Sequence, residues 1–396
     1  VKAFDEPRPY PIPRELLTTN WREVVEDPHI QVIIELVGGT TIARDIILTS
    51  LKLGKPVITA NKALLSAYGE ELFSAAAANN ANIYYEASVA GGIPIIKAIR
   101  EAFVGNRITH IYGIVNGTCN YILTKMKEEG SDFAQVLEQA QKQGYAEAEP
   151  SLDVDGWDSM HKIGILASLA HGFWVSPKKI FVEGIRPVSL MDIRFAEQLG
   201  YTIKLLGIVK QIDSTASKGK KSRIQVSVYP ALIPSSHVLA RVNDVFNAVF
   251  VRGDIVGETL FFGRGAGKDA TASAVLSDIA DSALDLKYGT KSRLRPFVPH
   301  EKNGEIVPIG EVKSQYYIRI GVVDKPGVLA KISTILGNSK ISIASVIQPE
   351  SRDTEIVPLI MMTHSAPNSA MEKALSKIEK LPVVKSKPVM LRVENF

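Results

Sequence analysis

The stretch IQVIIELVGGTTIARDIILTSLKLGKPVITA, residues 30–60, indicates the fold class of this chain. It contains an apolar, β-branched run, then an amphipathic run, and then a second short apolar run. The alternation continues through four further segments, at residues 64–80, 82–89, 93–105 and 108–115. Strands that alternate with helices are typical of a parallel sheet covered by helices. The pattern therefore predicts a doubly wound α/β domain in residues 1–115.

The rest of the chain has a different organisation. Residues 116–290 begin with helical segments and continue with strand candidates separated by turn residues, which is typical of an α+β domain with a largely antiparallel sheet. A glycine-rich loop precedes a helix at 270–288, which we expect to return to the first domain. A stretch rich in proline, glycine and charge at 291–314 predicts a linker. Residues 315–396 follow the order βαββαβ of a ferredoxin-like module.

Composition excludes several classes of protein. The 396 residues include 46 basic and 42 acidic residues, a net charge of +4 spread along the chain, so nucleic acid is not an expected partner. The one short basic cluster, at 217–221, is interpreted as a solvated hairpin tip. No apolar run approaches the roughly 20 residues of a membrane span, and a single cysteine allows no intrachain disulfide. We therefore expect a cytoplasmic protein that binds no membrane.

The segment GYAEAEPSLDVDGWDSMHK, residues 144–162, concentrates five carboxylates ahead of a single lysine. Asp155 is a candidate N-cap of the helix that follows, and Asp158 would lie in its first turn. Asp158 and Lys162 are four residues apart and share a helix face, where they can form a simple ion pair. The upstream acids are either solvated loop residues or part of a site for an amino-acid substrate. In such a site the acids would bind the substrate's ammonium group while the lysine exchanges a proton with an oxygen.

Three further segments carry candidate ligand contacts. Lys62 stands where a strand ends and a helix begins, at the edge of open α/β sheets where ligands bind, although a surface lysine is the simple alternative. The glycine-rich segments EASVAGGIP, 86–94, and GRGAGKDA, 263–270, either present main-chain groups to a ligand or are ordinary turns. A zinc site is not supported, because the seven histidines do not cluster along the sequence and Cys119 is the single cysteine.

Six ordered segments resemble homoserine dehydrogenases in order and spacing. They are IELVGG, VITANKALL, EASVAGGIPII, GIVNGTCNYILTKM, GYAEAEPSLDVDGWDSMHK and GRGAGKDATASAVLSD. DKPGVLAKI, residues 324–332, resembles an ACT domain, so the resemblance covers residues 1–396. It implies a Rossmann-like nucleotide-binding domain at 1–115, a substrate-binding and dimerisation domain at 116–290, and an ACT regulatory domain at 315–396.

The resemblance implies the reversible reduction of L-aspartate 4-semialdehyde to L-homoserine with NAD or NADP, on the route to threonine, methionine and isoleucine. By position, Lys162 resembles the family's proton donor, and Lys62 resembles a lysine close to substrate and cofactor, so both are candidate catalytic residues. Glu147 and Asp158 resemble substrate-binding residues, and Asp153 would support them.

The resemblance also implies a cofactor site and an ion site. Contacts to the nicotinamide side of the cofactor align with Gly38, Lys62, Gly265 and Gly267. A structural sodium site, made largely of main-chain oxygens, aligns with Glu86, Val89, Gly91 and Ile93. Because no glycine-rich pyrophosphate turn precedes residue 30, we expect the sequence to start after that element, with roughly 30 to 40 residues of a βαβ half absent. Lys2 is a candidate contact to a 2′-phosphate.

Partners follow from the same resemblance. Small molecules, homoserine and aspartate semialdehyde, are the expected substrates, and the ACT module implies an amino-acid effector, usually threonine. We expect a homodimer or homotetramer formed through the middle sheet and the ACT module. The alternative hypothesis is a catalytically silent amino-acid-binding or oligomerising fragment. A dehydrogenase acting on another amino-acid aldehyde is a further alternative, which the turnover of homologous substrates would detect.

Overall fold

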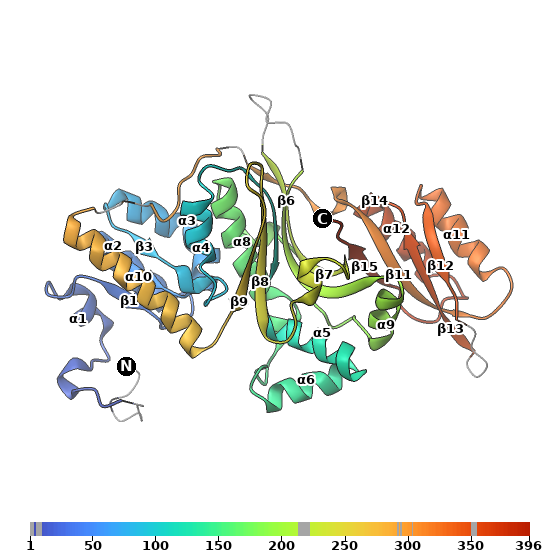
Figure 1. Ribbon diagram of the computed structural model, residues 1–396, viewed down its shortest axis with the longest axis horizontal. Helices are drawn as coiled ribbons and strands as arrows, with labels where there is room; N and C mark the ends of the chain where they lie inside the picture. Colours follow the sequence, from blue (N-terminus) through green and yellow to red (C-terminus); the bar gives the residue numbers. More distant parts are fainter. Residues whose placement is uncertain are drawn as a thin grey trace.

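The computed structural model describes residue 4 and residues 10–212, 222–290, 293, 295–302, 304–349 and 355–396. Lys2 and the basic cluster at 217–221 lie outside the described residues. Figure 1 shows three parts along the long axis of the molecule, with a small N-terminal sheet at one end and the ferredoxin-like module at the other.

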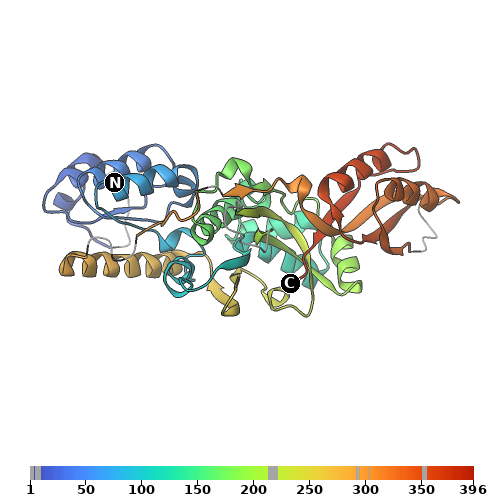
Figure 2. The same cartoon turned by 90° about the horizontal axis from the view of Figure 1, so that it is seen from above.

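The N-terminal part is built on a parallel sheet of β1 (Ile33–Glu35), β2 (Val57–Thr59) and β3 (Ile83–Tyr84), in that order. Four helices connect or flank these strands, namely α1 (Trp21–Glu26), α2 (Ile42–Lys52), α3 (Lys62–Ala78) and α10 (Lys268–Tyr288). Figure 2 shows α10 running along this part, and Tyr84 Oη donates a hydrogen bond of 2.8 Å to Asp285 Oδ2 of that helix. The alternation of apolar and amphipathic runs from residue 30 onward thus predicted β1, α2, β2, α3 and β3 correctly, whereas α1 lies before that pattern.

The strand expected at 108–115 is an exception, because it does not belong to the parallel sheet. This strand, β4 (Ile108–Ile114), pairs antiparallel with β6 (Tyr201–Gln211) and with β8 (Phe246–Gly253). An apolar run indicates that a strand is buried but carries no information about which strands lie beside it. The prediction of a parallel partner was therefore wrong, although the prediction of a strand was correct.

The middle part has the expected antiparallel sheet, which continues into the C-terminal module in the order β12-β13-β11-β15-β7-β6-β4-β8-β9. Its remaining strands are β7 (Arg223–Pro234) and β9 (Gly257–Arg264), with the short β5 (Phe181–Val182) and β10 (Glu305–Ile306) pairing with β7. Its helices are α4 (Ile95–Lys97), which continues as a wider turn over Ala98–Ala102, α5 (Gly117–Glu129), α6 (Phe133–Lys142), α7 (Ser151–Val154), α8 (Trp157–His171) and α9 (Leu190–Gln198).

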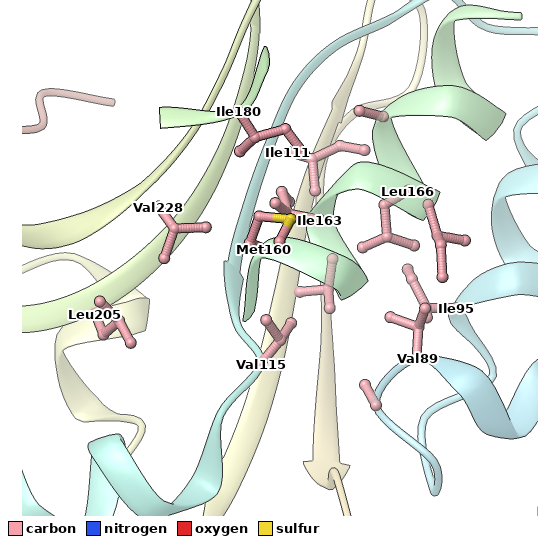
Figure 3. Close-up of a cluster of buried hydrophobic side chains, with 14 of the residues drawn as sticks. Val89, Ile95, Ile111, Val115, Met160, Ile163, Leu166, Ile180, Leu205 and Val228 are labelled. Carbon is pink, nitrogen blue, oxygen red and sulfur yellow. The ribbon is translucent and has the colours of Figure 1, made fainter. Parts of the chain in front are cut away.

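Helix α8 lies in the main hydrophobic core. Figure 3 shows its residues Met160, Ile163 and Leu166 in one cluster with side chains of β4, β7 and the turn near Val89. Each of these three side chains is at most 6% exposed. A helix packed this closely on its apolar side leaves little freedom for its polar residues, so Asp158 is held in a defined place.

The C-terminal module confirms the predicted βαββαβ order. Its elements are β11 (Lys313–Val323), α11 (Val328–Asn338), β12 (Ile343–Ile347), β13 (Ile356–Thr363), α12 (Asn368–Glu379) and β15 (Val389–Val393), with a short β14 (Ala366–Pro367) before α12. Strand β15 pairs in parallel with β7, where Arg392 and Val393 lie opposite Ala231 and Leu232. The module is therefore joined to the middle part by a shared sheet.

Among the described residues, no helix combines the length and the apolar character that are needed to cross a membrane. The 21-residue helix α10 is long enough, but it contains four aspartates and two lysines.

Candidate active site

Polar side chains at the carboxyl ends of β1 and β2 are bonded to each other. Glu35, the last residue of β1, is 1% exposed and accepts main-chain N–H bonds from Val37 at 2.8 Å and Gly38 at 3.1 Å. Its other oxygen accepts a hydrogen bond of 2.7 Å from Thr59 Oγ1 at the end of β2. Gly38 has a φ of +78°, and a Cβ added there would meet no atom within 4 Å. The backbone at Gly38 is therefore open to a ligand.

Lys62 begins α3 at the same sheet edge. Asn61 is the N-cap of this helix, because its Oδ1 accepts the N–H of Leu64 at 3.1 Å. The amide nitrogen of Asn61 donates to the carbonyl oxygen of Gly39 at 2.7 Å. The structure thus brings the Gly38 turn and Lys62 together, as expected for ligand contacts at the carboxyl ends of parallel strands.

Asp158 has a lysine on each of its carboxylate oxygens. Lys62 Nζ lies 2.8 Å from Oδ1, and Lys162 Nζ lies 2.7 Å from Oδ2. Lys162 Nζ also donates a hydrogen bond of 2.7 Å to the carbonyl oxygen of Val115, just after β4. The side chains of Asp158 and Lys162 are 7% and 9% exposed, whereas that of Lys62 is 41% exposed. The predicted ion pair between Asp158 and Lys162 is confirmed, and Lys62 joins it from the N-terminal part.

The charges around Asp158 keep its carboxyl group ionised. Burial opposes ionisation, but the charges of Lys162 and Lys62 and their hydrogen bonds outweigh it and hold the pKa of Asp158 well below its usual value. Asp153 behaves differently, because burial dominates there and raises its pKa, and the neighbouring charge of Asp158 adds to the rise. The two carboxyl groups are therefore close in space and unlike in acidity.

Asn116 connects these two carboxylates. Its Nδ2 lies 2.7 Å from Asp153 Oδ1 and 2.9 Å from Asp158 Oδ2. Its Oδ1 accepts the main-chain N–H of Cys119 at 2.8 Å and so caps α5. Cys119 itself is fully buried, and burial raises the pKa of its thiol well above the usual value, which agrees with a packing role rather than a nucleophilic one.

Three acids of the 144–162 segment lie elsewhere, and one of them, Glu149, is exposed and accepts the N–H of Ser151 at 3.2 Å. Glu147 is on an exposed loop, and its described hydrogen bond is a main-chain one, from Gln141 Nε2 to Glu147 O at 3.0 Å. Asp155 does not cap α8, so that prediction was wrong. Gly156 is the N-cap, in the left-handed region at φ +88°, and Asp155 pairs instead with Arg186 at 2.6 Å. Because Gly156 occupies the N-cap position, Asp155 stands one residue too early to cap the free N–H groups of α8.

The second glycine-rich segment lies against the turn that follows β3. The N–H of Gly92 donates to the carbonyl oxygen of Arg264 at 3.0 Å. Gly265 is buried, and a Cβ there would fall 2.0 Å from the Asn247 side chain, so close packing explains this glycine. Gly267 has a φ of +114° and open space around it at the start of α10. Of the two, Gly267 is the one that leaves room for a ligand.

The residues aligned with an ion site form the turn between β3 and α4. The carboxylate of Glu86 accepts the N–H groups of Ile96 at 2.9 Å and Lys97 at 2.8 Å, at the start of α4. Burial raises the pKa of Glu86 to about 7. Its side chain is thus used within the protein, and an ion in this turn would have to be bound through main-chain oxygens. Val89, Gly91 and Ile93 are buried in the same turn.

Sequence reasoning missed three groups of this site: the Asn116 amide, the Val115 carbonyl and the Glu35 carboxylate. Asn116 left a signal, since an asparagine directly before a helical segment is a candidate N-cap. Glu35 also left one, because a carboxylate inside an apolar strand has to find a partner when it is buried. The Val115 carbonyl left none, because every residue carries that group.

Comparisons with known proteins agree with this geometry. The model of the family "Homoserine dehydrogenase" matches residues 94–280, "Homoserine dehydrogenase, NAD binding domain" matches 4–86, and "ACT domain" matches 316–383. The homoserine dehydrogenase of Neisseria gonorrhoeae is 43% identical over 377 residues, which are 94% of this chain and 85% of that protein. That of Pseudomonas aeruginosa is 41% identical over 388 residues, 96% of this chain and 87% of that protein.

Solved structures agree as well. The homoserine dehydrogenase of Thiobacillus denitrificans has a TM-score of 0.89 and 41% identity, covering 96% of this chain and 85% of that one. A hyperthermophilic archaeal homoserine dehydrogenase in complex with NADPH has a TM-score of 0.58 and 31% identity, covering 68% of this chain and 76% of that one. Likeness over nearly the whole chain does not favour the catalytically silent alternative. The chain belongs to the homoserine dehydrogenase family, whose members are oxidoreductases with an NAD-binding domain.

Proposed function

We propose that the group formed by Lys62, Asp158 and Lys162 is the catalytic centre in which L-aspartate 4-semialdehyde and L-homoserine are interconverted. The observation that carries this proposal is the pairing of one buried carboxylate with two ammonium groups, at 2.8 and 2.7 Å. Lys62 comes from the N-terminal part and Lys162 from α8, so the centre lies where a cofactor on the first part would meet a substrate on the second.

Lys162 is the proposed proton donor. An ammonium group has three N–H bonds, and those of Lys162 to Asp158 and to the Val115 carbonyl leave one for a substrate oxygen. In the reduction this N–H would protonate the aldehyde oxygen, and in the oxidation the neutral amine would accept the hydroxyl proton. Lys62, which is more exposed, would place its positive charge near the developing alkoxide.

Three acids of the 144–162 segment are the proposed substrate-binding residues, namely Glu147, Asp153 and Asp158. Asp153 lies beside Asp158 through the shared Asn116 amide, and Glu147 lies on the exposed loop before α7. Together these carboxylates would attract the substrate's ammonium group. Asp158 contributes in a second way, because its two bonds fix the positions of both lysines.

NADP or NAD is the proposed cofactor, which when bound would supply or accept the hydride at the reacting carbon. The residues present fit such a group. The backbone at Gly38 is open and turned toward the sheet edge by its bond to Glu35, and Gly267 is open at the start of α10. Gly265 would shape that loop by its packing on Asn247. These glycines, with Lys62, are the proposed contacts to the nicotinamide side.

A structural sodium ion in the turn 86–93 is a separate proposal. The proposed ligands are main-chain oxygens of Glu86, Val89, Gly91 and Ile93, and oxygen is the ligand type that a hard cation prefers. The test is a melting temperature measured in sodium chloride and in choline chloride at equal ionic strength. A higher value in sodium is expected, and equal values would argue against the site.

For the whole chain we propose the division into a nucleotide-binding domain at 1–115, with α10 added, a substrate-binding and dimerisation domain at 116–290, a linker at 291–314 and a regulatory ACT domain at 315–396. A threonine-sensitive homodimer or homotetramer, formed through the middle sheet and the ACT module, is the proposed assembly. Strand β9 supports it, because it ends the sheet order and keeps Phe262 55% exposed.

The proposed catalytic centre is tested by homoserine-dependent formation of NADPH or NADH, followed by absorbance. Asp158→Asn is expected to lower kcat/KM by about 100-fold or more, because the two ammonium groups lose the charge that positions them. Glu138→Gln, on the exposed face of α6, is the matched control and should behave like the wild type. Equal kcat/KM for Asp158→Asn and the wild type would disprove the assignment.

A further inference from the structure

The side chain of Asn116 makes three described hydrogen bonds, which connect the carboxylates of the proposed catalytic centre to the start of α5. Its Nδ2 donates to Asp153 Oδ1 at 2.7 Å and to Asp158 Oδ2 at 2.9 Å, and its Oδ1 accepts the N–H of Cys119 at 2.8 Å. The residue is 5% exposed, so these bonds are made away from water. One primary amide therefore uses both of its N–H groups on two carboxylates.

The orientation of this amide follows from its surroundings. The main-chain N–H of Cys119 can only donate, so the Asn116 atom that faces it has to be the oxygen. The nitrogen then has to face Asp153 and Asp158, which are ionised acceptors. The first turn of α5 thus selects the rotamer and the amide orientation that the carboxylates need.

The two carboxylates have an electrostatic reason to need such a donor. Each raises the free energy of the other's ionised form, and both are partly or fully removed from water. Lys62 and Lys162 are bonded to Asp158, while Asp153 has the Asn116 amide as its described side-chain hydrogen-bond partner. Without this donor Asp153 would lose its described side-chain hydrogen bond, and only the more distant charges of Lys162 and Lys62 would offset the repulsion from Asp158.

We propose that Asn116 is a positioning residue of the dehydrogenase reaction, which keeps Asp153 and Asp158 ionised and in place while it caps α5. It acts on Lys162 through Asp158, since Lys162 Nζ and Asn116 Nδ2 share the same oxygen, Oδ2. It also acts through its neighbour in sequence, Val115, whose carbonyl oxygen accepts the second bond of Lys162. The inference rests on the roles proposed above for Asp158 and Lys162.

The competing explanation is that Asn116 is only a helix cap. A cap residue supplies one acceptor to the helix, and aspartate and serine supply it as well as asparagine does. Neither can donate to both carboxylates, and aspartate would add a third negative charge. Asn116→Asp and Asn116→Ser therefore keep the cap and remove the positioning bonds, which separates the two explanations.

The test measures the pH profile of kcat/KM for homoserine and, by calorimetry, the affinity for homoserine at several pH values. Loss of a donor to an ionised carboxyl raises its pKa, so the acidic limb of the profile should move to higher pH in both variants, and further in Asn116→Asp. At a pH near neutrality kcat should fall about tenfold or more. Asn20→Asp, at the exposed N-cap of α1, is the matched control and should show neither change.

The outcomes are distinct. Both variants are compared with the wild type in the acidic limb of the pH profile, in kcat and in homoserine affinity. If none of these changes, and the melting temperatures stay within a few degrees of the wild-type value, Asn116 is only a helix cap and the inference is wrong. If Asn116→Asp does not fold, Asn116→Ser carries the same test. If Asp158→Asn also leaves kcat/KM unchanged, the assignment of the proposed catalytic centre is wrong. If Asp158→Asn lowers kcat/KM strongly while the Asn116 variants behave like the wild type, only the positioning role of Asn116 is rejected.

Discussion

The buried carboxylate of Asp158 shows how much one residue can determine when its neighbours are charged. It is 6% exposed, yet its pKa is held well below the usual value because an ammonium group lies on each oxygen. A buried charge without such partners would be strongly unfavourable. The ionised carboxylate of Asp158 is therefore stable in its buried position only while it is paired with Lys62 and Lys162. Substitution of any one of the three residues should disturb the other two.

Lys162→Ala is expected to lower kcat by about 10²- to 10⁴-fold, because it removes the proposed proton donor. The affinity for NADP or NAD, measured by fluorescence quenching, should stay close to that of the wild type, since Lys162 bonds to Asp158 and Val115 inside the middle part. Lys142→Ala, at an exposed position of α6, provides the control. Wild-type turnover in Lys162→Ala would remove this residue from the mechanism.

A second buried carboxyl should make stability depend on pH. Burial raises the pKa of Glu86 to about 7, so the folded protein binds a proton there that the unfolded chain releases near pH 4.5. Between about pH 4.5 and 7 the native state then holds more protons than the unfolded state, and this group lowers the free energy of unfolding as the pH rises.

Glu86→Gln should reduce the decrease in the free energy of unfolding that accompanies a rise in pH, because the amide does not titrate. The prediction is checked by urea unfolding of both proteins at pH 5 and pH 7.5. For each protein this gives the decrease in the free energy of unfolding between the two pH values. The wild-type decrease minus that of the variant is the contribution of Glu86. The amide can still accept the N–H of Ile96 or Lys97. Identical pH dependence in the two proteins would show that the Glu86 carboxyl titrates normally.

At the scale of elements, helix α9 is stabilised by a cap at its N-terminus and by side-chain bonds to strand β11. Ser189 and Asp192 form a capping box, and Asp192 also accepts bonds from Arg319 Nε at 2.6 Å and Tyr317 Oη at 3.0 Å. Asp192 is fully buried, and both of its partners lie on β11. One carboxylate therefore begins a helix of the middle part and attaches it to the ACT module.

Asp192→Ala should lower the free energy of unfolding by about 3–5 kcal/mol, because it leaves the guanidinium of Arg319 without its buried partner. Glu197→Ala is the matched control on the same helix, since its pair with Lys127 is exposed and is expected to contribute about 0–1 kcal/mol. Chemical unfolding monitored by circular dichroism measures both. Similar values for the two variants would contradict the role assigned to Asp192.

At the scale of the whole molecule, the ACT module and the middle part share one sheet. Strand β15 pairs with β7, and Arg392 of β15 is 1% exposed. Its Nη2 donates a hydrogen bond of 2.8 Å to Asn368 Oδ1, and its Nη1 donates one of 2.5 Å to Glu183 Oε2. From β7 the sheet continues through β6 to β4, which ends one residue before the Val115 carbonyl that holds Lys162. A contiguous series of paired strands therefore connects the module to the proposed catalytic centre.

We expect L-threonine to inhibit homoserine oxidation and Arg392→Met to weaken that inhibition. The concentration for half-inhibition should rise by about fivefold or more, within the usual range of allosteric coupling. Threonine affinity in the absence of substrate, measured by calorimetry, should change little. Arg252→Met, the same substitution on β8, is the control. Unaltered inhibition in a folded Arg392→Met protein would show that the coupling does not depend on this junction.

Sequence patterns predicted the parts of the fold that depend on local spacing. The strands and helices of residues 30–89, the antiparallel middle part and the βαββαβ module follow from runs of apolar residues and from turn residues. The Asp158–Lys162 pair also follows, because two residues four apart on a helix are neighbours whatever the rest of the chain does. The expectation that the sequence begins after a glycine-rich turn stays a prediction.

The order and type of the elements and the helical part of the site therefore follow from the amino-acid sequence alone. Three further features depend on the packing of distant elements: the position of β4 in the antiparallel sheet, the pair of Asp155 with Arg186, and the contact of Lys62 with Asp158. The cause is the sequence separation over which each interaction acts. Helix spacing and turn chemistry depend on residues a few positions apart. Strand pairing and ion pairs between distant residues form only after packing has brought their elements together.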